Sequence, residues 1–319
     1  MRHLITGAAG FIGSQLTDAL LEGGDAVAGV DDFYLGRPAH LAAARANPRF
    51  SFVEADVSEV PSATGAFRAL AGAAPPDMIW HLAANSDIAA GVADPSIDFR
   101  RTLQTTFATI EGAKAIGARA IAFASTSAVY GETDQLLTED VGPLLPISNY
   151  GAAKLAGEAL LSAAAESSLD RIWIFRFPNV IGPRATHGAL YDFAGRLACR
   201  PPSLRVLGDG AQTKPYLHVS ELIEAMRFVV ANASQRRNVF NVGPEGPGSS
   251  VRFMAETMIA RMAPGTPIAY SGGDRGWVGD VPRFSYSTER LAGLGWRPTL
   301  SSDEAVRRAA DELALEAVG

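Results

Sequence analysis

The chain has 319 residues, of which 47% are hydrophobic and 19% charged, a composition typical of globular proteins and unlike that of disordered or fibrous ones. Lysine and arginine number 28 against 34 aspartates and glutamates, so the formal net charge is −6, which does not favour a nucleic-acid-binding protein. The single cysteine, Cys199, excludes an intramolecular disulfide and a multi-thiolate zinc site, and no stretch has the roughly 18 apolar residues of a membrane span.

Short β-rich runs alternate with longer alanine-rich runs of helical spacing over the first half of the chain. The predicted strands are 3–6, 26–30, 50–54, 78–82, 120–125 and 172–176, and the predicted helices include 13–22, 96–116 and 150–167. Such alternation predicts an α/β fold with a parallel sheet and helices on both faces. Because Met1-Arg2-His3 runs directly into the first strand, we expect no signal peptide and a cytoplasmic protein without membrane contact.

Beyond Pro178 this alternation ends, and clusters of glycine and proline interrupt the chain. We interpret this half as a smaller lobe, from which a helix at 219–231 and a strand at 239–242 return to the main sheet. The expected division is therefore one domain of residues 1–177 plus about 215–243, and a lobe of about 178–214 plus 244–319.

A glycine-rich turn follows the first predicted strand and opens the first predicted helix. It places Gly7, Gly10 and Gly13 at Gly-x-x-Gly-x-x-Gly spacing. Glycine lets the backbone approach a pyrophosphate, and the helix N-terminus offers N–H groups and a favourable dipole. Asp31 follows the second predicted strand, where a carboxylate can accept both ribose hydroxyls of an adenosine, which favours NAD over NADP.

Three acidic residues near this turn could have structural roles in place of binding the cofactor. Asp31 could instead cap a loop, and for Asp32 we favour that role. Asp56, beside Val57 after the third predicted strand, could contact the adenine or serve almost equally well as a helix N-cap.

Tyr150 and Lys154 lie four residues apart at the start of a predicted helix, so their side chains share one face. A free tyrosine has a pKa of about 10 and is a poor base at neutral pH. A nearby ammonium is expected to lower that pKa and allow proton transfer with an alcohol. The spacing is common by chance, and it gains weight here because it follows a nucleotide-binding turn and the polar strand end Ser125-Thr126-Ser127.

Taken together, the motifs resemble those of the extended short-chain dehydrogenase/reductase superfamily, in its nucleotide-sugar epimerase and dehydratase branch. The matching segments are Thr6–Ser14, His81–Ala84, Ser125–Gly131, Tyr150–Lys154, Arg176–Arg184, Gly208–Gly210, Tyr216–Val219, Gly279–Pro282 and Leu294–Trp296, which span nearly the whole chain in order. The resemblance implies a Rossmann-type doubly wound parallel sheet with a smaller C-terminal substrate lobe. It also implies NAD as cofactor, a nucleotide-diphosphate sugar as substrate, and a homodimer formed through the helices at 96–116 and 150–167.

The same resemblance implies a role for individual residues. Tyr150 would be the acid/base, Lys154 would hold the nicotinamide ribose and tune Tyr150, and Thr126 would hydrogen-bond the reacting sugar oxygen. The implied cofactor set is Gly7, Gly10, Phe11, Ile12, Gly13, Asp31, Asp32, Asp56, Val57, Leu82, Ala83, Ala84, Tyr150, Lys154 and Phe177. The implied substrate set is Ser125, Thr126, Ser127, Asn179, Lys214 and Arg275.

Some of these assignments depart from the usual pattern of the branch. Arg275 could bind the diphosphate together with Asn179, although its spacing to Gly279-Asp280 differs from the commonest one, and Lys214 stands where many relatives have arginine. The scattered histidines show no metal-ligand spacing, so we expect no metal site.

The reaction can be narrowed by the groups that follow Thr126. Dehydratases resembling this chain carry Asp-Glu there to eliminate water, and nucleotide-linked uronic acid decarboxylases carry Glu before Val-Tyr-Gly, whereas this chain has Ser127-Ala128. We therefore expect a 4-epimerase that acts on a UDP-sugar through a transient 4-keto-sugar, with hydride returned to the opposite face. The open alternatives are a 4,6-dehydratase, a uronic acid decarboxylase, an NAD(P)-dependent keto-sugar reductase and a non-enzymatic NAD-binding regulator.

Overall fold

The computed structural model describes residues 1–273 and 286–316, and the chain divides into two compact units. The first unit consists of Met1–Gly131, Pro143–Arg176 and Met226–Phe240, and the second of Glu132–Gly142, Phe177–Ala225 and Asn241–Gly319. The expected division differs from this one at 132–142, 177, 215–225 and 241–243, all of which belong to the second unit.

A seven-stranded sheet with the strand order β11-β6-β5-β4-β1-β2-β3 forms the centre of the first unit. The strands are β1 (Arg2–Thr6), β2 (Ala26–Asp31), β3 (Phe50–Glu54), β4 (Met78–His81), β5 (Ala120–Ala124), β6 (Arg171–Arg176) and β11 (Arg237–Asn241). The five pairings among β1 to β6 are all parallel. All four residues of β4 are buried, as expected for a strand covered on both faces. The Rossmann-type fold predicted from the sequence is thereby confirmed.

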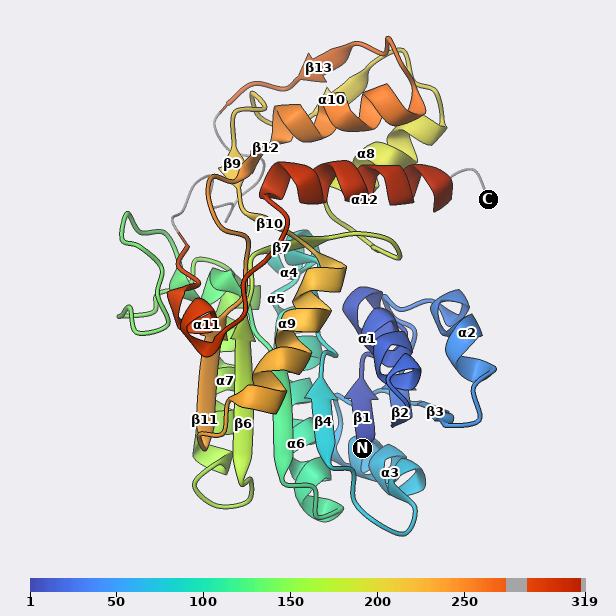
Figure 1. The fold of residues 1–319 in the computed structure, drawn as a ribbon, viewed down its shortest axis with the longest axis vertical. Helices are drawn as coiled ribbons and strands as arrows, with labels where there is room; N and C mark the ends of the chain where they lie inside the picture. Colours follow the sequence, from blue (N-terminus) through green and yellow to red (C-terminus); the bar gives the residue numbers. More distant parts are fainter. Residues whose placement is uncertain (274–285, 317–319) are drawn as a thin grey trace. The chain divides into compact units, whose positions relative to one another are not determined.

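Helices pack on both faces of this sheet (Figure 1). Helix α1 lies on one face, and α3, α6 and α7 lie on the other, where a buried core that includes Phe67, Ile121 and Leu161 joins them to the strands. The helices of this unit are α1 (Phe11–Glu22), α2 (Ala42–Arg45), α3 (Val60–Ala71), α4 (Ile88–Ala93), α5 (Pro95–Asp98), α6 (Thr105–Ala115) and α7 (Asn149–Ala164), with 3-10 turns at Pro38–Leu41 and Ser127–Tyr130.

The helix expected at 96–116 is present at 95–115, but it is not α-helical throughout. It consists of α5, a π-helical segment at Phe99–Gln104, and α6. The hydroxyl of Thr105 donates to the carbonyl oxygen of Arg100, five residues earlier, at 3.1 Å, which suits the wider turn of a π-helix. Because π-helical turns are rare and often lie at functional sites, this interruption directs attention to the residues around it.

The second unit contains short strands and a cluster of helices. Its strands are β7 (Asn179–Ile181), β8 (Leu204–Val206), β9 (Thr213–Lys214), β10 (Tyr216–His218), β12 (Ser249–Ser250) and β13 (Ile268–Tyr270), paired as β7–β10, β9–β12 and β8–β13. Its helices are α8 (Ala189–Ala198), α10 (Val251–Met262), α11 (Glu289–Leu294) and α12 (Ser302–Glu316), while α9 (Val219–Asn232) begins in this unit and ends in the first. Helices α8, α10 and α12 share a buried core that includes Leu197, Met258 and Val306.

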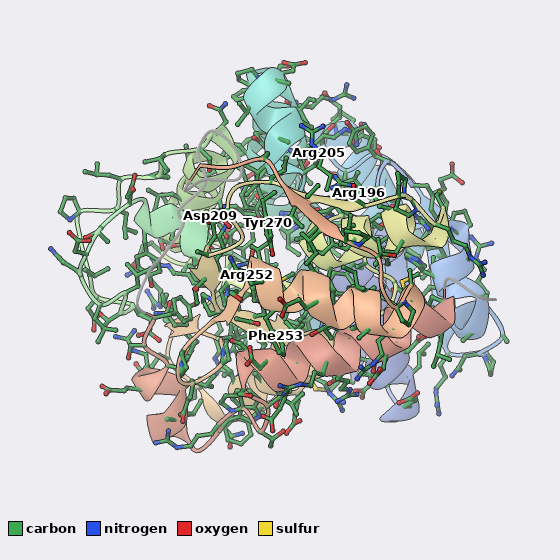
Figure 2. The ribbon with its side chains drawn as sticks, turned by 90° about the horizontal axis from the view of Figure 1, so that it is seen from above. Arg196, Arg205, Asp209, Arg252, Phe253 and Tyr270 are labelled. Carbon is green, nitrogen blue, oxygen red and sulfur yellow. The ribbon has the colours of Figure 1, made fainter. Side chains whose placement is uncertain are left out.

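Polar contacts link the strands of this unit to its helices (Figure 2). The guanidinium of Arg252, on α10, lies 5.5 Å from the centre of the Tyr270 ring on β13. Arg196, on α8, donates to the carbonyl oxygen of Arg205 on β8 at 2.7 Å. Among the described residues, no helix is both long and apolar enough to span a bilayer.

Candidate active site

The turn between β1 and α1 brings glycine backbone into close contact. A Cβ added at Gly13 would lie 2.0 Å from the carbonyl oxygen of Gly7, so no larger residue fits there. Gly7 has a φ of +74°, which favours glycine, and its Cα faces the backbone of Ala83. Gly10 is the N-cap of α1 and makes no side-chain cap. The first N–H groups of α1 can therefore receive an anion such as a pyrophosphate.

Asp31 is held beside this turn at the end of β2. Its Oδ2 accepts the N–H of Ala9 at 2.9 Å, and its Oδ1 accepts the N–H of Phe33 at 2.8 Å. Burial raises the pKa of Asp31, while those two hydrogen bonds act in the opposite direction. The carboxylate is thus fixed next to the glycines, where its remaining lone pairs can accept ribose hydroxyls.

Asp32 is engaged with the π-helical segment. Its Oδ2 lies 2.7 Å from Nη1 of Arg101, whose guanidinium also stacks 3.7 Å from the centre of the Tyr34 ring. The Oδ1 of Asp32 accepts the N–H of Tyr34 at 3.1 Å. These contacts fit the loop-capping role that we favour for Asp32.

Asp56 likewise has local partners. It accepts the N–H of Ser58 at 2.8 Å and forms an ion pair with Arg100 at 2.8 Å. The N-cap of the following helix, α3, is Glu59, so Asp56 does not cap that helix. Val57 is buried in the core of the first unit.

Thr126, Tyr150 and Lys154 meet at the end of β5. Thr126 is the N-cap of a 3-10 turn, and its hydroxyl accepts the N–H of Ala128 at 3.1 Å and is hydrogen-bonded to Tyr150. Tyr150 stands in the first turn of α7, and Ser148 caps that helix. The Nζ of Lys154 donates to the carbonyl oxygen of Ala124 at 2.6 Å and lies 5.8 Å from the centre of the Tyr150 ring. The first unit therefore brings the three expected catalytic residues together.

The electrostatics of this group differ from the expectation in one respect. Burial raises the pKa of Tyr150, the charge of Asp98 raises it further, and the hydrogen bond from Thr126 only partly offsets the two. Burial lowers the pKa of Lys154 to about 7, against the opposing charges of Glu158 and Asp98. The expected lowering of the Tyr150 pKa is thus absent, because burial and the charge of Asp98 outweigh the opposing hydrogen bond.

A buried network behind Lys154 was not expected from the sequence. Glu158 accepts hydrogen bonds from Ser125 and, at 3.0 and 2.7 Å, from Nε and Nη2 of Arg176, and Arg176 also donates to the hydroxyl of Tyr130. Glu158 lies four residues beyond Lys154, and this spacing was the available signal for it. Ser125 therefore braces this network, while Ser127 begins the 3-10 turn.

His81 is a second buried group that the sequence analysis left without a role. Its ring nitrogens lie 2.7 Å from the hydroxyl of Thr6 and 3.0 Å from that of Thr106. Burial lowers its pKa to about 3, with a further contribution from Lys154, so the ring stays neutral. His81 thereby fixes the end of β4. Residues 82–84 follow this strand and lie beside the glycine turn, where the hydroxyl of Thr6 accepts the N–H of Ala83 at 3.3 Å.

The remaining candidates belong to the second unit. Phe177 is buried, Lys214 is 8% exposed on β9, and Asn179 is exposed at the start of β7 and donates to the carbonyl oxygen of Pro215 at 3.4 Å. Arg275 lies outside the described residues. Within residues 1–273 and 286–316, no group of three or more His, Cys, Asp or Glu side chains could hold a metal ion.

Comparison with known proteins gives consistent matches. Residues 3–243 match the model of the NAD dependent epimerase/dehydratase family. The chain is 33% identical to a UDP-glucose 4-epimerase of Mycolicibacterium smegmatis over 97% of each chain, and 30% identical to a dTDP-glucose 4,6-dehydratase of Streptomyces griseus over 88% of this chain and 86% of that one. The solved structure of the Thermus thermophilus UDP-glucose 4-epimerase in complex with NAD superposes with a TM-score of 0.84 at 27% identity, covering 98% of this chain and 99% of that one.

Proposed function

Because the chain belongs to the NAD dependent epimerase/dehydratase family, as its motifs indicate, we propose that it is a nucleotide-sugar 4-epimerase acting on a UDP-sugar. The observation that carries the proposal is the Thr126–Tyr150–Lys154 group, together with the two residues that follow Thr126 in the 3-10 turn. These two residues are Ser127 and Ala128. This group can exchange a proton with a sugar hydroxyl, and the turn beside it supplies no carboxylate for a further step.

In the proposed reaction, Tyr150 acts as the phenolate, after its own proton has been lost to solvent. It accepts the proton of the sugar C4 hydroxyl while Thr126 hydrogen-bonds the same oxygen. Hydride transfer from and to C4 is the chemistry that NAD would supply when bound. Lys154 holds the nicotinamide ribose, and its ammonium stabilises negative charge that develops on Tyr150. After the keto-sugar has rotated and presents its opposite face, Tyr150 gives the proton back to the sugar oxygen.

Binding of the two nucleotides is assigned to separate parts of the chain. The turn from Gly7 to Gly13 receives the cofactor pyrophosphate, since it leads into the N-terminus of α1, whose first N–H groups have no side-chain cap. Asp31 receives the adenosine ribose. In the second unit, Asn179 and Lys214 are the proposed ligands of the substrate diphosphate, where the single ammonium of Lys214 gives charge without the planar fork of arginine.

Elimination of water or loss of a carboxylate needs a proton donor or acceptor within hydrogen-bond reach of the reacting atoms. Ser127 is a very weak acid and Ala128 has no exchangeable side-chain proton. We therefore expect the keto-sugar to rotate and to be reduced again without elimination or decarboxylation, although a relative 30% identical to this chain is a 4,6-dehydratase.

The test is to incubate the purified protein with a panel of nucleotide sugars and examine the products by NMR and mass spectrometry. The expected product is a C4 epimer with the mass of the substrate. A steady-state product lighter by one water would favour a 4,6-dehydratase, and one lighter by one carbon dioxide would favour a decarboxylase. Release of a reduced sugar at the expense of added NADPH would favour a reductase, and no turnover with NAD bound would favour a regulator.

We also propose that the protein forms a homodimer through the exposed faces of α6 and α7 in the first unit. Phe99 and Phe107, on the π-helical segment and α6, are 61% and 45% exposed. The charged residues of α7, Lys154 and Glu158, are both buried, so its exposed face is uncharged. A helix face without charge and exposed aromatic side chains nearby are typical of an interaction surface.

Sedimentation equilibrium of the unchanged protein is expected to give twice the chain mass of 33.5 kDa at micromolar concentration. Phe107→Glu should shift the protein towards the monomer, since it places a charge in the proposed interface. Leu315→Glu, at a leucine that is 76% exposed on α12, is the matched control and should leave the dimer intact. A monomer in the unchanged protein would contradict the proposal.

A further inference from the structure

Four charged side chains of the first unit are buried together around the start of α7. Asp98 is 1% exposed, Lys154 2%, and Glu158 and Arg176 5% each. Buried charges persist when opposite charges accompany them, because desolvation otherwise neutralises the group. Two anions and two cations make this group neutral as a whole, so the question is which anion accompanies which cation.

Glu158 forms an ion pair with Arg176. Both of its carboxylate oxygens accept hydrogen bonds from that guanidinium, at 3.0 and 2.7 Å. Burial works against the charged guanidinium, yet the hydrogen bonds and charge of Glu158 raise the pKa of Arg176 overall. The charge of Glu158 also raises the pKa of Lys154, so the ammonium of Lys154 shares this carboxylate with a guanidinium that takes both of its oxygens.

Among the residues that the structure describes, Lys154 has only uncharged hydrogen-bonding and ring partners. Its Nζ donates to the carbonyl oxygen of Ala124 at 2.6 Å and lies 4.7 Å from the centre of the Phe123 ring. Neither contact supplies a full negative charge. The remaining buried anion of the group is Asp98.

Asp98 ends α5, immediately before the π-helical segment. Its Oδ1 accepts the side-chain N–H of Asn85 at 2.8 Å, while its Oδ2 has no hydrogen-bond partner among the described residues. That oxygen lies against Gly91, where an added Cβ would be 1.8 Å from it. The carbonyl oxygen of Gly91 in turn accepts the side-chain N–H of Asn149, the residue before Tyr150, at 3.0 Å. The Asp98 carboxylate is therefore packed between α4 and the first turn of α7.

We propose that Asp98 is a positioning residue of the Tyr150–Lys154 pair, whose buried carboxylate adds to the charge of Glu158 and increases the fraction of Lys154 that is an ammonium at neutral pH. This inference rests on the acid–base roles proposed for the pair. Burial raises the pKa of Asp98, while the hydrogen bond from Asn85 and the charge of Lys154 act in the opposite direction, so a nearby charge offsets part of the cost of burying this carboxylate. The charge of Asp98 acts on both members of the pair, since it raises the pKa of Lys154 and that of Tyr150.

None of the other titratable groups around Lys154 among the described residues takes over the role proposed for Asp98. Glu158 and Tyr150 face it from α7, and Arg176 lies beyond Glu158 on β6. His81, on β4, is neutral because burial lowers its pKa to about 3. Asp87, the N-cap of α4, uses its carboxylate to accept the N–H of Ala90. Asp98 is thus the anion whose removal changes the charge around Lys154 without breaking an ion pair.

The sign of the expected effect follows from the charge. Asp98→Asn keeps the shape and the acceptor for Asn85 but removes one negative charge. Both the Lys154 ammonium and the neutral Tyr150 hydroxyl then lose a stabilising anion, so both pKa values should fall, each by about one unit at the effective dielectric constant of a protein interior. The pH–rate profile should accordingly shift towards acid as a whole, whereas loss of folding alone would lower its height without moving it.

The chain makes a direct measurement possible, because it has only three lysines, Lys114, Lys154 and Lys214. Protein labelled with carbon-13 at lysine Cε gives three NMR signals, and Lys154→Met identifies the one from Lys154. Its titration midpoint is expected near pH 7 in the unchanged protein and about one pH unit lower in Asp98→Asn. Asp94→Ser is the matched control, since it removes an exposed charge from the same helix, retains an N-cap oxygen, and should not move the midpoint.

A second variant covers the case in which Asp98→Asn does not fold. Gly91→Ala keeps the carboxylate but forces it to move away from the new methyl group, and the Lys154 midpoint should again change. An unchanged midpoint in either folded variant would overturn the inference. The measurement does not need turnover, so a protein that inverts no sugar but shows the shift would refute only the proposed function. An active enzyme with an unshifted midpoint would refute only the role of Asp98.

Discussion

Replacing Tyr150 with phenylalanine should lower turnover by about 100- to 10,000-fold, the usual contribution of a positioned acid–base group, while NAD remains bound. The ring would keep its place in the first turn of α7, because Ser148 still caps that helix. What is lost is the Tyr150 hydroxyl, the group that we propose accepts and returns the substrate proton. The measurement is the steady-state rate with the nucleotide sugar found in the product screen, together with equilibrium binding of NAD.

Tyr34→Phe provides the matched control for that experiment. Tyr34 is a 48% exposed tyrosine of the same unit, and its ring would still stack with Arg101 after the change. Its substitution should leave the rate within about two-fold, since an exposed hydroxyl away from the reacting atoms contributes little. Near-normal turnover of Tyr150→Phe would show that Tyr150 does not carry the chemistry, whatever the family resemblance implies.

Much of the first unit, which contains the expected NAD-binding motifs, could be predicted because its sequence signals are local. Gly7 and Gly13 are required where a strand turns directly into a helix and backbone meets backbone, and such spacing can be recognised in the sequence. Tyr150 and Lys154 were found because four residues make one helical turn. The strands of the sheet were predicted to within two residues because they are buried apolar runs between turn residues.

The residues that were missed depend on contacts distant in sequence. Asp98 and Glu158 look like exposed charges of surface helices, since acidic residues are rarely buried, and only the folded chain reveals their partners. The π-helical segment at Phe99–Gln104 interrupts a run whose composition indicates one continuous helix. In the second unit, strands of two or three residues, such as Thr213–Lys214, are too short for alternation to be recognised.

Removing the Glu158 carboxylate should be among the most destabilising substitutions in the first unit. Glu158→Gln leaves Arg176, which is 5% exposed, as a buried cation without its ion-pair partner. Breaking a buried pair from one side costs about 3–5 kcal/mol of unfolding free energy, because the remaining charge stays desolvated. Urea denaturation of the variant and the unchanged protein measures this difference directly.

Glu166→Gln is the matched control, because Glu166 also pairs with arginines but is 55% exposed. Exposed pairs contribute about 0–1 kcal/mol, so this variant should unfold close to the unchanged protein. A double variant, Glu158→Gln with Arg176→Met, should recover part of the loss, since it removes the stranded cation as well. If Glu158→Gln were no more destabilising than Glu166→Gln, water would have to reach Arg176 in the folded chain. The charge balance that assigns Asp98 to Lys154 would then have to be revised, because Glu158 would no longer be committed to Arg176.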